Sequence, residues 1–381
     1  MSAGVTLRGA QVLWPDGLGA GDLSLADGAI AHRTHGRVVD LSGFLLLPGI
    51  VDAHGDGFER HLAPRRGAMT DLGRGLVAAE AELAANGITT ATLAQFYSWE
   101  GGLRGPEFAA KMLTALAGTR PRVATDLRAQ LRVEMAMCDA YPEIEAMIAE
   151  FGIGYVVFND HLPHDALAKG KRPPRLTGQA LRIGRNPDRH LEIMQGLHER
   201  MAEVEPALDA LAARLIASGV RLGSHDDRSE EARFRHRARG VRIAEFPETP
   251  EAAQAAHTGG DAVIMGAPNV MRGGSHNGNA AASAMVAAGC VDALASDYHY
   301  PSLVAAAFHL CDAGICDLGA AWRLVSSGPA RILGLEDRGV LRPGLRADLC
   351  VIDPDTRHVG ATIAGGRITY PPGAAADRFT A

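Results

Sequence analysis

Six side chains that can bind a metal ion follow short apolar segments of this sequence. All are imidazoles or carboxylates, and each lies at or just after the carboxyl end of an expected strand: His54, Asp56, Glu134, His161, His225 and Asp297. Such mixed ligands suit zinc, manganese or iron. Six ligands are too many for one four-coordinate ion but enough for two, which a carboxylate such as Glu134 could bridge. We therefore expect two divalent ions, zinc before manganese or iron, in a centre of the kind that hydrolyses phosphates and amides.

These side chains can meet only if their strands run parallel in one sheet. The middle of the chain alternates short apolar segments with stretches of helical periodicity, which predicts repeated β-α-β units. The expected strands lie at 49–54, 87–94, 129–135, 154–161, 221–225, 242–246, 262–268 and 292–297. Eight strands fit a (β/α)8 barrel, in which all carboxyl ends converge on one face. An open doubly wound sheet is the alternative, but no Gly-x-Gly-x-x-Gly motif follows the first strand.

Both ends of the chain consist of short apolar segments separated by turn residues. The segments at 5–13, 21–25 and 29–32 are brief, and residues 339–370 alternate apolar runs with Gly, Pro and Asp. This pattern is typical of strands joined by tight turns. We therefore predict an α/β protein in which residues 1–47 and 338–381 form a small β-sandwich and residues 48–337 form the barrel.

Composition excludes several classes of protein. The 381 residues are 47% apolar and 22% charged, as in ordinary globular proteins. A net charge of −6 argues against nucleic-acid binding. The apolar run at 41–51 is too short to span a bilayer, and the first residues do not resemble a signal peptide. Five sparse cysteines imply no disulfide framework. We expect a cytoplasmic protein that binds neither membranes nor nucleic acid; a homo-oligomer is compatible with the barrel, although no motif sets the number of subunits.

Basic side chains gather in the segments that follow the ligand-bearing strands. Residues 161–190 hold seven Lys and Arg against two Asp, and a glycine-rich stretch at 269–279 follows the seventh strand. Glycine lets backbone N–H groups approach an anion closely. We therefore expect a small anionic substrate whose phosphates contact some of these side chains, with a solvated mobile loop as the alternative. The candidates are Arg60, His61, Arg65, Lys171, Arg172, Asp226, Arg228, Arg272, Ser275, His276 and Asn279.

Several stretches resemble the amidohydrolase superfamily. They include LPGIVDAHGD at 47–56 and GVLRPGLRADLCVID at 339–353. Within that superfamily, the blocks at 56–65, 224–227, 245–253, 265–279 and 295–303 resemble the diphosphatases of the carbon–phosphorus lyase pathway, which act on ribose 1-methylphosphonate 5-triphosphate. The resemblance spans residues 5 to 370. It implies a binuclear metal hydrolase that releases diphosphate during phosphonate catabolism, with Asp297 as the catalytic residue that orients the attacking water and carries its proton.

The sequence also departs from these patterns. Most of the superfamily has His-x-His on the first strand, whereas this chain has His54-Gly55-Asp56, and Glu134 stands where many members use a carboxylated lysine. Both features resemble the phosphonate subgroup. The segment 162–186 does not match that subgroup, and Arg228 replaces an expected small hydroxyl residue. The last two departures lie in loops that we expect to contact the substrate, so they affect the identity of the substrate more than the metal site.

Two other functions remain open from the sequence. An amide, cyclic-imide or amine hydrolase could use the same scaffold, but its neutral substrate would not need so many cations. A non-catalytic scaffold protein should have lost metal ligands, and this chain retains all six.

Overall fold

The computed structural model describes residues 4–33, 36–65, 71–273, 280–371 and 373–380. The chain divides into two compact units. The first comprises Met1–Leu93, Leu116–Arg128 and Ala262–Ala381, and the second comprises Ala94–Ala115 and Ala129–Asp261. This division by contacts differs from the boundaries at 47/48 and 337/338 expected from the sequence, which stay a prediction.

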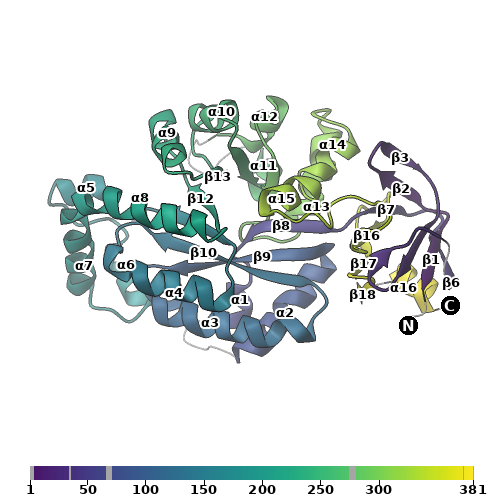
Figure 1. The fold of residues 1–381 in the computed structure, drawn as a ribbon, viewed down its shortest axis with the longest axis horizontal. Coiled ribbons are helices and arrows are strands. Elements are labelled where there is room, and N and C mark those ends of the chain that lie inside the picture. Colours follow the sequence, from purple (N-terminus) through teal and green to yellow (C-terminus); the bar gives the residue numbers. More distant parts are fainter. Residues whose placement is uncertain (1–3, 34–35, 66–70, 274–279, 372, 381) are drawn as a thin grey trace. The chain divides into compact units, whose positions relative to one another are not determined.

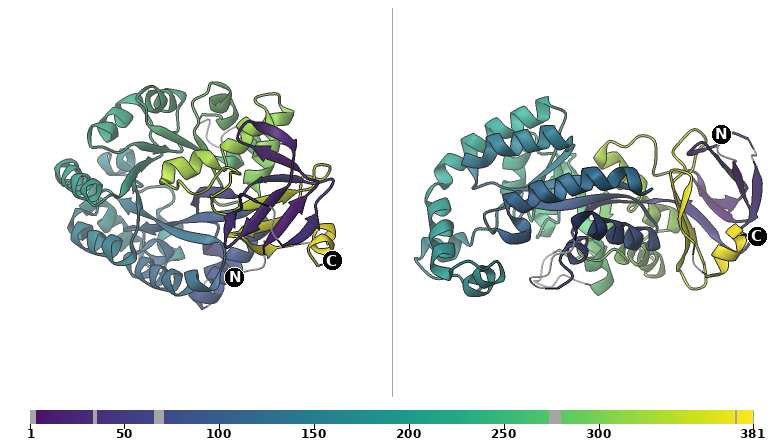
Figure 2. Two further views of the ribbon diagram at one scale, coloured as in Figure 1. Left: turned by 45° about the vertical axis from the view of Figure 1, so that its right-hand side comes forward. Right: turned by 90° about the horizontal axis from the view of Figure 1, so that it is seen from below.

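Two β-sheets in the first unit are built from both ends of the chain, whose strands lie side by side in Figure 2. An apolar cluster that includes Leu7, Leu46, Val351 and Ile363 contains buried residues of both sheets. The sequence expectation of a β-sandwich from both termini is confirmed. One sheet has the order β5 (Ala29–Ile30), β4 (Leu23–Ala26), β1 (Val5–Arg8) and β6 (Arg37–Asp40); the other has the order β18 (Arg367–Tyr370), β17 (Val359–Ala364), β16 (Leu349–Ile352), β7 (Leu45–Pro48), β2 (Gln11–Trp14) and β3 (Gly17–Ala20).

The strands of the middle segment form one eight-stranded sheet in sequence order. These are β8 (Ile50–Gly55), β9 (Ile88–Tyr97), β10 (Asp126–Glu134), β11 (Tyr155–Asn159), β12 (Arg221–His225), β13 (Ile243–Glu245), β14 (Ala262–Gly266) and β15 (Ala293–Ala295) (Figure 1). The pairs β8–β9, β10–β11, β11–β12, β12–β13 and β14–β15 are parallel. A bridge between Gly55 and Asp297 joins the first strand to the chain just after the last. The fold is therefore the expected (β/α)8 barrel.

Helices connect these strands. They are α1 (Glu59–Leu62), α2 (Leu72–Ala85), α3 (Pro106–Thr119), α4 (Tyr141–Phe151), α5 (His164–Ala168), α6 (Leu176–Arg182), α7 (Pro187–Glu199), α8 (Met201–Ala217), α9 (Glu230–Ala238), α10 (Pro250–Thr258), α11 (Ala267–Arg272), α12 (Ala282–Ala287), α13 (Ser302–Asp312), α14 (Leu318–Arg323) and α15 (Ser327–Leu333), with α16 (Gly373–Thr380) at the end of the chain. Side chains accept from backbone N–H groups at several N-termini, as Asp71 does from Arg74 and Thr249 from Ala252. In the part of the chain that the structure describes, no helix has the length and apolarity needed to cross a membrane.

Several element boundaries differ from the sequence expectation. Strand β9 continues to Tyr97 rather than ending at residue 94, because all ten of its residues are buried. Strand β11 ends at Asn159, so His161 lies in the following loop. Strand β14 ends at Gly266 rather than at residue 268, because residues 267–272 form α11 with Pro268 in its first turn, where proline is tolerated. Residues 187–217 form two helices, α7 and α8, that meet at Arg200.

The basic segment after β11 is folded, which corrects its description as a loop. Residues 161–190 contain α5, α6 and the start of α7. Leu167, Leu176 and Met194 from this region share a buried apolar cluster with Trp99. His190 is only 1% exposed. The apolar residues spaced between the charges therefore anchor this segment on the second unit.

A buried ion-pair network holds the chain that follows β12. Arg233 of α9 is fully buried and contacts two carboxylates: its Nη1 lies 2.9 Å from Asp227 Oδ2 and its Nε lies 3.2 Å from Asp261 Oδ2. Ser224 Oγ donates to the same oxygen of Asp227 at 2.7 Å. Leaving such a charge buried without its partner is strongly destabilising. The network therefore fixes the segment 224–227, which includes His225.

A histidine beside this network predicts a measurable pH dependence of stability. The Nε2 atom of His236 lies 3.7 Å from Asp227 Oδ1. Burial, partly opposed by Asp227, lowers the pKa of His236 to about 4. An unfolded histidine has a pKa near 6.5, so the unfolded chain binds the extra proton first, and stability falls as pH drops from 6.5 towards 4. Between about pH 7.5 and about pH 5, we expect the free energy of unfolding of the wild type to fall by about 2 kcal/mol more than that of His236→Gln. Urea denaturation at each pH measures both losses, and equal losses would contradict the prediction.

Candidate metal centre

Three of the predicted ligands lie at neighbouring strand ends in the first unit. His54 and Asp56 come at the end of β8, and Asp297 follows β15. The backbone N–H of Asp297 donates to the carbonyl of His54 at 3.0 Å, and the N–H of Asp56 donates to the carbonyl of Asp297 at 2.8 Å. Asp297 adopts a φ of 56°, a region that is strained for a residue other than glycine. Main-chain bonds therefore hold these residues together in an otherwise unfavourable conformation.

Asp52 ties the same two strand ends together from within the sheet. It is fully buried and accepts from Ser296 Oγ at 2.5 Å, from Ser296 N at 3.0 Å and from His54 N at 3.3 Å. Burial raises the pKa of Asp52, and the hydrogen bonds from Ser296 oppose that rise. Asp52 was absent from the sequence prediction, which considered only residues at the ends of strands. Its contacts mark it as a residue that positions His54.

Two carboxylates and one imidazole come together in the second unit. Glu100, Glu134 and His161 each offer an atom within 4.8 Å of the others. Glu134 is fully buried, pairs with His161 Nδ1, and accepts from His161 N at 3.2 Å and from Trp99 Nε1 at 3.3 Å. Carboxylates and imidazole are ligands of zinc, so this group fits a metal ion. The structure thus unites the predicted pair Glu134 and His161 and adds Glu100.

Glu100 was not predicted from the sequence, because the second barrel strand was expected to end at residue 94. Strand β9 runs to Tyr97, which puts Glu100 close to the carboxyl end of the strand, where catalytic groups of barrels lie. Arg104 Nη1 donates to Glu100 Oε2 at 2.8 Å. The signal in the sequence is an acidic residue three positions after a long apolar strand.

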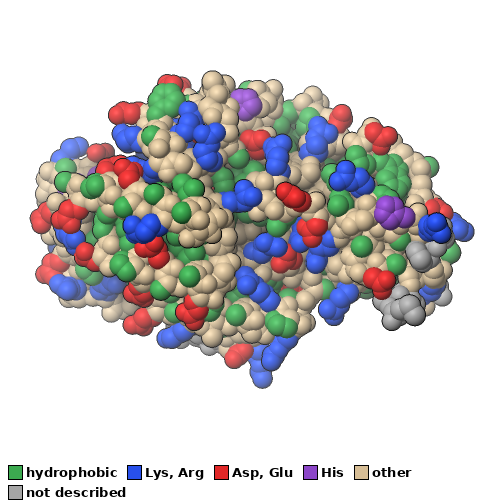
Figure 3. Space-filling model, viewed as in Figure 1, with side chains coloured by type: hydrophobic (Ala, Val, Ile, Leu, Met, Phe, Trp, Pro, Cys, Tyr) green, Lys and Arg blue, Asp and Glu red, His purple; other side chains and the backbone are tan. Residues whose placement is uncertain are grey.

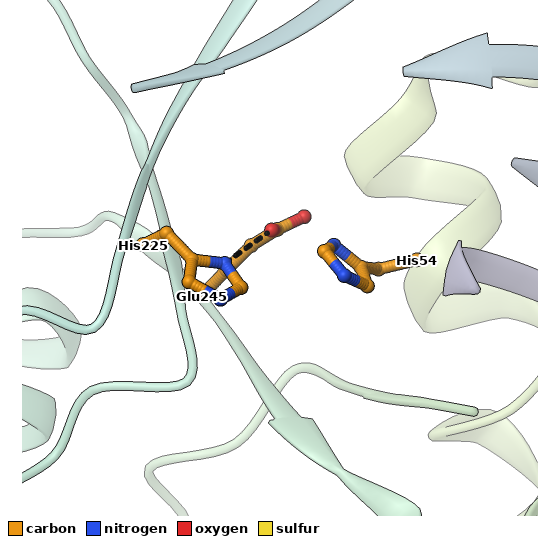
Figure 4. A group of neighbouring side chains, drawn as sticks. All are labelled: His54, His225 and Glu245. Carbon is orange, nitrogen blue, oxygen red and sulfur yellow. Dashed lines mark hydrogen bonds and ion pairs between the residues drawn. The ribbon is translucent and has the colours of Figure 1, made fainter. Parts of the chain in front are cut away.

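His225 meets a second unpredicted carboxylate, Glu245, which is the last residue of β13 (Figure 4). His225 Nδ1 lies 3.2 Å from Glu245 Oε2, and Arg132 Nη2 lies 2.7 Å from His225 Nε2. A guanidinium can only donate, so Nε2 of the neutral ring accepts and Nδ1 carries the proton that it donates to Glu245. Metal-binding histidines are commonly oriented in this way by an outer carboxylate. This tautomer makes Nε2 the atom of His225 that suits a metal ion.

Glu245 is itself held on its other oxygen. It is fully buried, and its Oε1 accepts from Gln130 Nε2 at 2.7 Å and from Tyr155 Oη at 2.6 Å. Burial, followed by the charge of Glu245, holds the pKa of Tyr155 well above its usual value, so the phenol stays a donor. Phe246, the next residue, has a φ of 52°. The neighbouring groups therefore fix both the position and the orientation of this carboxylate.

We expect Glu245→Gln to weaken metal binding without unfolding the protein. The amide keeps the shape of the side chain but removes the charge that orients the His225 ring, and loss of such an outer partner typically costs about 10–100-fold in metal affinity. Zinc competition against a chromogenic chelator measures the effect. Glu248→Gln is the matched control, because Glu248 lies just after Glu245 in the connection from β13 to α10 and makes an ion pair with exposed Arg228. Equal zinc affinity in both variants would refute the role of Glu245.

Two of the predicted phosphate-binding cations meet next to Asp297. Arg60 Nη1 donates to the carbonyl of Tyr298 at 3.0 Å, and Arg272 contacts the hydroxyl of the same Tyr298. The guanidinium of Arg60 also pairs with Glu82. The two arginines, from α1 and α11, therefore lie around the residue that follows Asp297.

Other predicted anion-binding residues are already paired with carboxylates. His61 Nε2 lies 2.5 Å from Glu82 Oε2. Arg172 Nη1 lies 2.8 Å from Asp188 Oδ1, and Arg228 Nε lies 2.9 Å from Glu248 Oε2. Charged side chains of both signs are interspersed over the face shown in Figure 3. An exposed ion pair such as Arg172–Asp188 contributes little to stability.

The remaining candidates lie at the surface or outside the described residues. Arg65 and Lys171 are exposed. Asp226 has a positive φ of 59°, and its Oδ1 lies 3.7 Å from His225 Nε2. The predicted residues Ser275, His276 and Asn279 lie outside the described residues.

Comparison with known proteins shows what the chain resembles. A model of the amidohydrolase family matches residues 200–370. The chain is 33% identical over 333 residues to the alpha-D-ribose 1-methylphosphonate 5-triphosphate diphosphatase of Escherichia coli K12, covering 85% of this chain and 87% of that protein.

Solved structures of similar fold include two hydrolases. The N-acetylglucosamine-6-phosphate deacetylase of Pasteurella multocida matches with a TM-score of 0.64 and 10% identity, over 96% of this chain and 99% of that one. The beta-aspartyl dipeptidase of Fervidobacterium islandicum AW-1 matches with a TM-score of 0.60 and 14% identity, over 98% of both chains. At these identities the likeness concerns the fold alone.

Proposed function

The chain belongs to the amidohydrolase family of metal-dependent hydrolases, and we propose that it hydrolyses ribose 1-methylphosphonate 5-triphosphate to the 5-phosphate and diphosphate. The observation that carries this proposal is the 33% identity to a diphosphatase named for that reaction, over 85% of the chain. The reaction is a step of phosphonate catabolism. A small anionic substrate of this kind also suits the basic residues near the strand ends.

The proposed centre holds two divalent ions, zinc before manganese or iron. Its ligands are the six residues predicted from the sequence: His54, Asp56, Glu134, His161, His225 and Asp297. Their donor chemistry supports the proposal, since the first unit supplies an imidazole beside two carboxylates and the second supplies two imidazoles and buried Glu134. Ions bound by such residues polarise phosphoryl oxygens and supply a nucleophilic water near neutral pH.

The protein residues then have distinct tasks. Asp297 orients the water and accepts its proton as the new bond to the α-phosphorus forms. The bond from that phosphorus to the oxygen it shares with the β-phosphate breaks, and diphosphate leaves with the electron pair. Arg60 and Arg272 offset the negative charge that develops on the phosphoryl oxygens. The proton passes from Asp297 to solvent or to product.

Phosphorus NMR tests the proposal directly. Metal-loaded protein is incubated with ribose 1-methylphosphonate 5-triphosphate, and nucleoside triphosphates and carboxamides are run in parallel. We expect diphosphate to appear from the phosphonate compound alone. If bound metal is confirmed and no phosphate ester reacts, the proposed substrate is wrong, and the amide, cyclic-imide and amine substrates become the leading alternative. Protein that cannot bind metal at all would favour a non-catalytic scaffold.

A further inference from the structure

We propose that Arg132 is a substrate-binding residue of this centre. When a metal ion binds to His225, Arg132 would exchange its hydrogen bond to His225 for one to an anionic oxygen of the substrate. The inference rests on the proposed function, because it takes His225 as a metal ligand. Arg132 was not among the residues expected from the sequence. Its position in the second unit carries the argument.

Arg132 lies on the inner face of the sheet, between groups of the candidate centre. Side chains alternate along a strand, so Gln130, Arg132 and Glu134 of β10 share one face. Arg132 is 4% exposed. A cation there lies two residues from the buried carboxylate of Glu134, within the candidate centre rather than on the surface.

Two contacts hold the guanidinium in place independently of His225. Asn159 Oδ1 accepts from Arg132 Nη2 at 3.1 Å and from Nε at 3.3 Å. The guanidinium carbon lies 3.9 Å from the centre of the Phe96 ring, within the range of a cation–π contact. These contacts fix the plane of the guanidinium. Loss of its bond to His225 would therefore redirect one donor rather than release the whole side chain.

The contact with His225 cannot coexist with a metal ion on the same atom. His225 Nε2 has one lone pair, which accepts from Arg132 Nη2 at 2.7 Å. A zinc–nitrogen bond of about 2.0–2.1 Å uses that lone pair. Metal binding at Nε2 therefore displaces Arg132 Nη2 from this atom, and the displaced N–H can turn to an acceptor on a bound substrate.

A phosphate oxygen is the acceptor that suits this donor. Guanidinium matches phosphate in geometry and carries a permanent positive charge. The same exchange makes anion binding depend on the metal, because Arg132 Nη2 leaves His225 only when a metal ion occupies Nε2. Arg132 would thus be a buried phosphate-binding cation supplied by the second unit.

Binding of inorganic diphosphate to Arg132 variants tests the proposal. Metal-free wild type, Arg132→Gln, Arg132→Lys and Arg128→Gln are each reloaded with zinc, and zinc content, zinc affinity and diphosphate affinity are measured by calorimetry and chelator competition. Arg128 is the matched control, because it lies on the same strand and pairs with Asp126 at the surface. Arg132→Lys keeps the charge and serves if the Gln variant does not fold.

We expect Arg132→Gln to keep zinc with equal or higher affinity and to bind diphosphate at least tenfold more weakly, with Arg132→Lys in between and Arg128→Gln unchanged. Without zinc, the difference between Arg132→Gln and wild type should shrink. Unchanged diphosphate affinity, or loss of zinc from both Arg132 variants, would overturn the proposal. If wild type binds no zinc, the proposed function and the role of Arg132 both fail. If wild type binds zinc but does not cleave the triphosphate, only the proposed function fails, and diphosphate affinity still decides the role of Arg132.

Discussion

Glu134→Gln should lose bound metal and nearly all activity. Glu134 is fully buried, contacts His161, and is the predicted bridging ligand. Glutamine has almost the same shape but carries no charge, so it cannot neutralise two cations in a buried site. We expect at least one equivalent of zinc per chain to be lost and kcat/KM to fall by roughly 10³-fold, the scale on which removing a major transition-state interaction acts.

Metal analysis and diphosphate release measure these two effects separately. Glu145→Gln is the control, because Glu145 makes an ion pair with exposed Arg214 and belongs to none of the donor groups described above. The circular dichroism spectrum of each variant checks that the protein is folded. A folded Glu134→Gln protein with a full complement of zinc would show that Glu134 is not a ligand.

Asp297→Asn should lower kcat much more than it lowers metal content. Asparagine tolerates the positive φ of 56° at this position, so the strained turn can persist. The amide cannot accept a proton from water, and loss of a positioned general base costs roughly 10²–10⁴-fold. We also expect the acidic limb of the kcat/KM profile to disappear, because protonation of Asp297 would cause that limb.

The measurement is diphosphate release across a range of pH, together with zinc analysis. Asp312→Asn is the matched control, since Asp312 pairs with Arg357 at the surface. An Asp297→Asn protein that retained both metals and full activity would exclude a role in proton transfer. A variant that lost zinc entirely would instead identify Asp297 as chiefly a ligand.

Much of the fold followed from the sequence. Alternation of apolar strands and amphipathic helices predicts a parallel barrel because βα units leave few other ways to bury both faces of a sheet. The strand at 221–225 was predicted with its observed bounds, and both termini form the expected sandwich. The six metal-binding candidates could be listed because polar residues that end buried strands are conspicuous. Their joint role as ligands stays a prediction.

Only the tertiary structure identified the partners of these residues. Glu245 and Arg132 take opposite sides of the His225 ring, although Arg132 is 93 residues away in sequence. Strand register and side-chain direction decide such contacts, and neither is encoded in local periodicity. The sequence likewise could not show that Arg60 and His61 both form ion pairs with Glu82 of α2. Residue type and spacing thus determined which chemistry the chain carries, whereas pairing across the folded barrel decided which groups orient it.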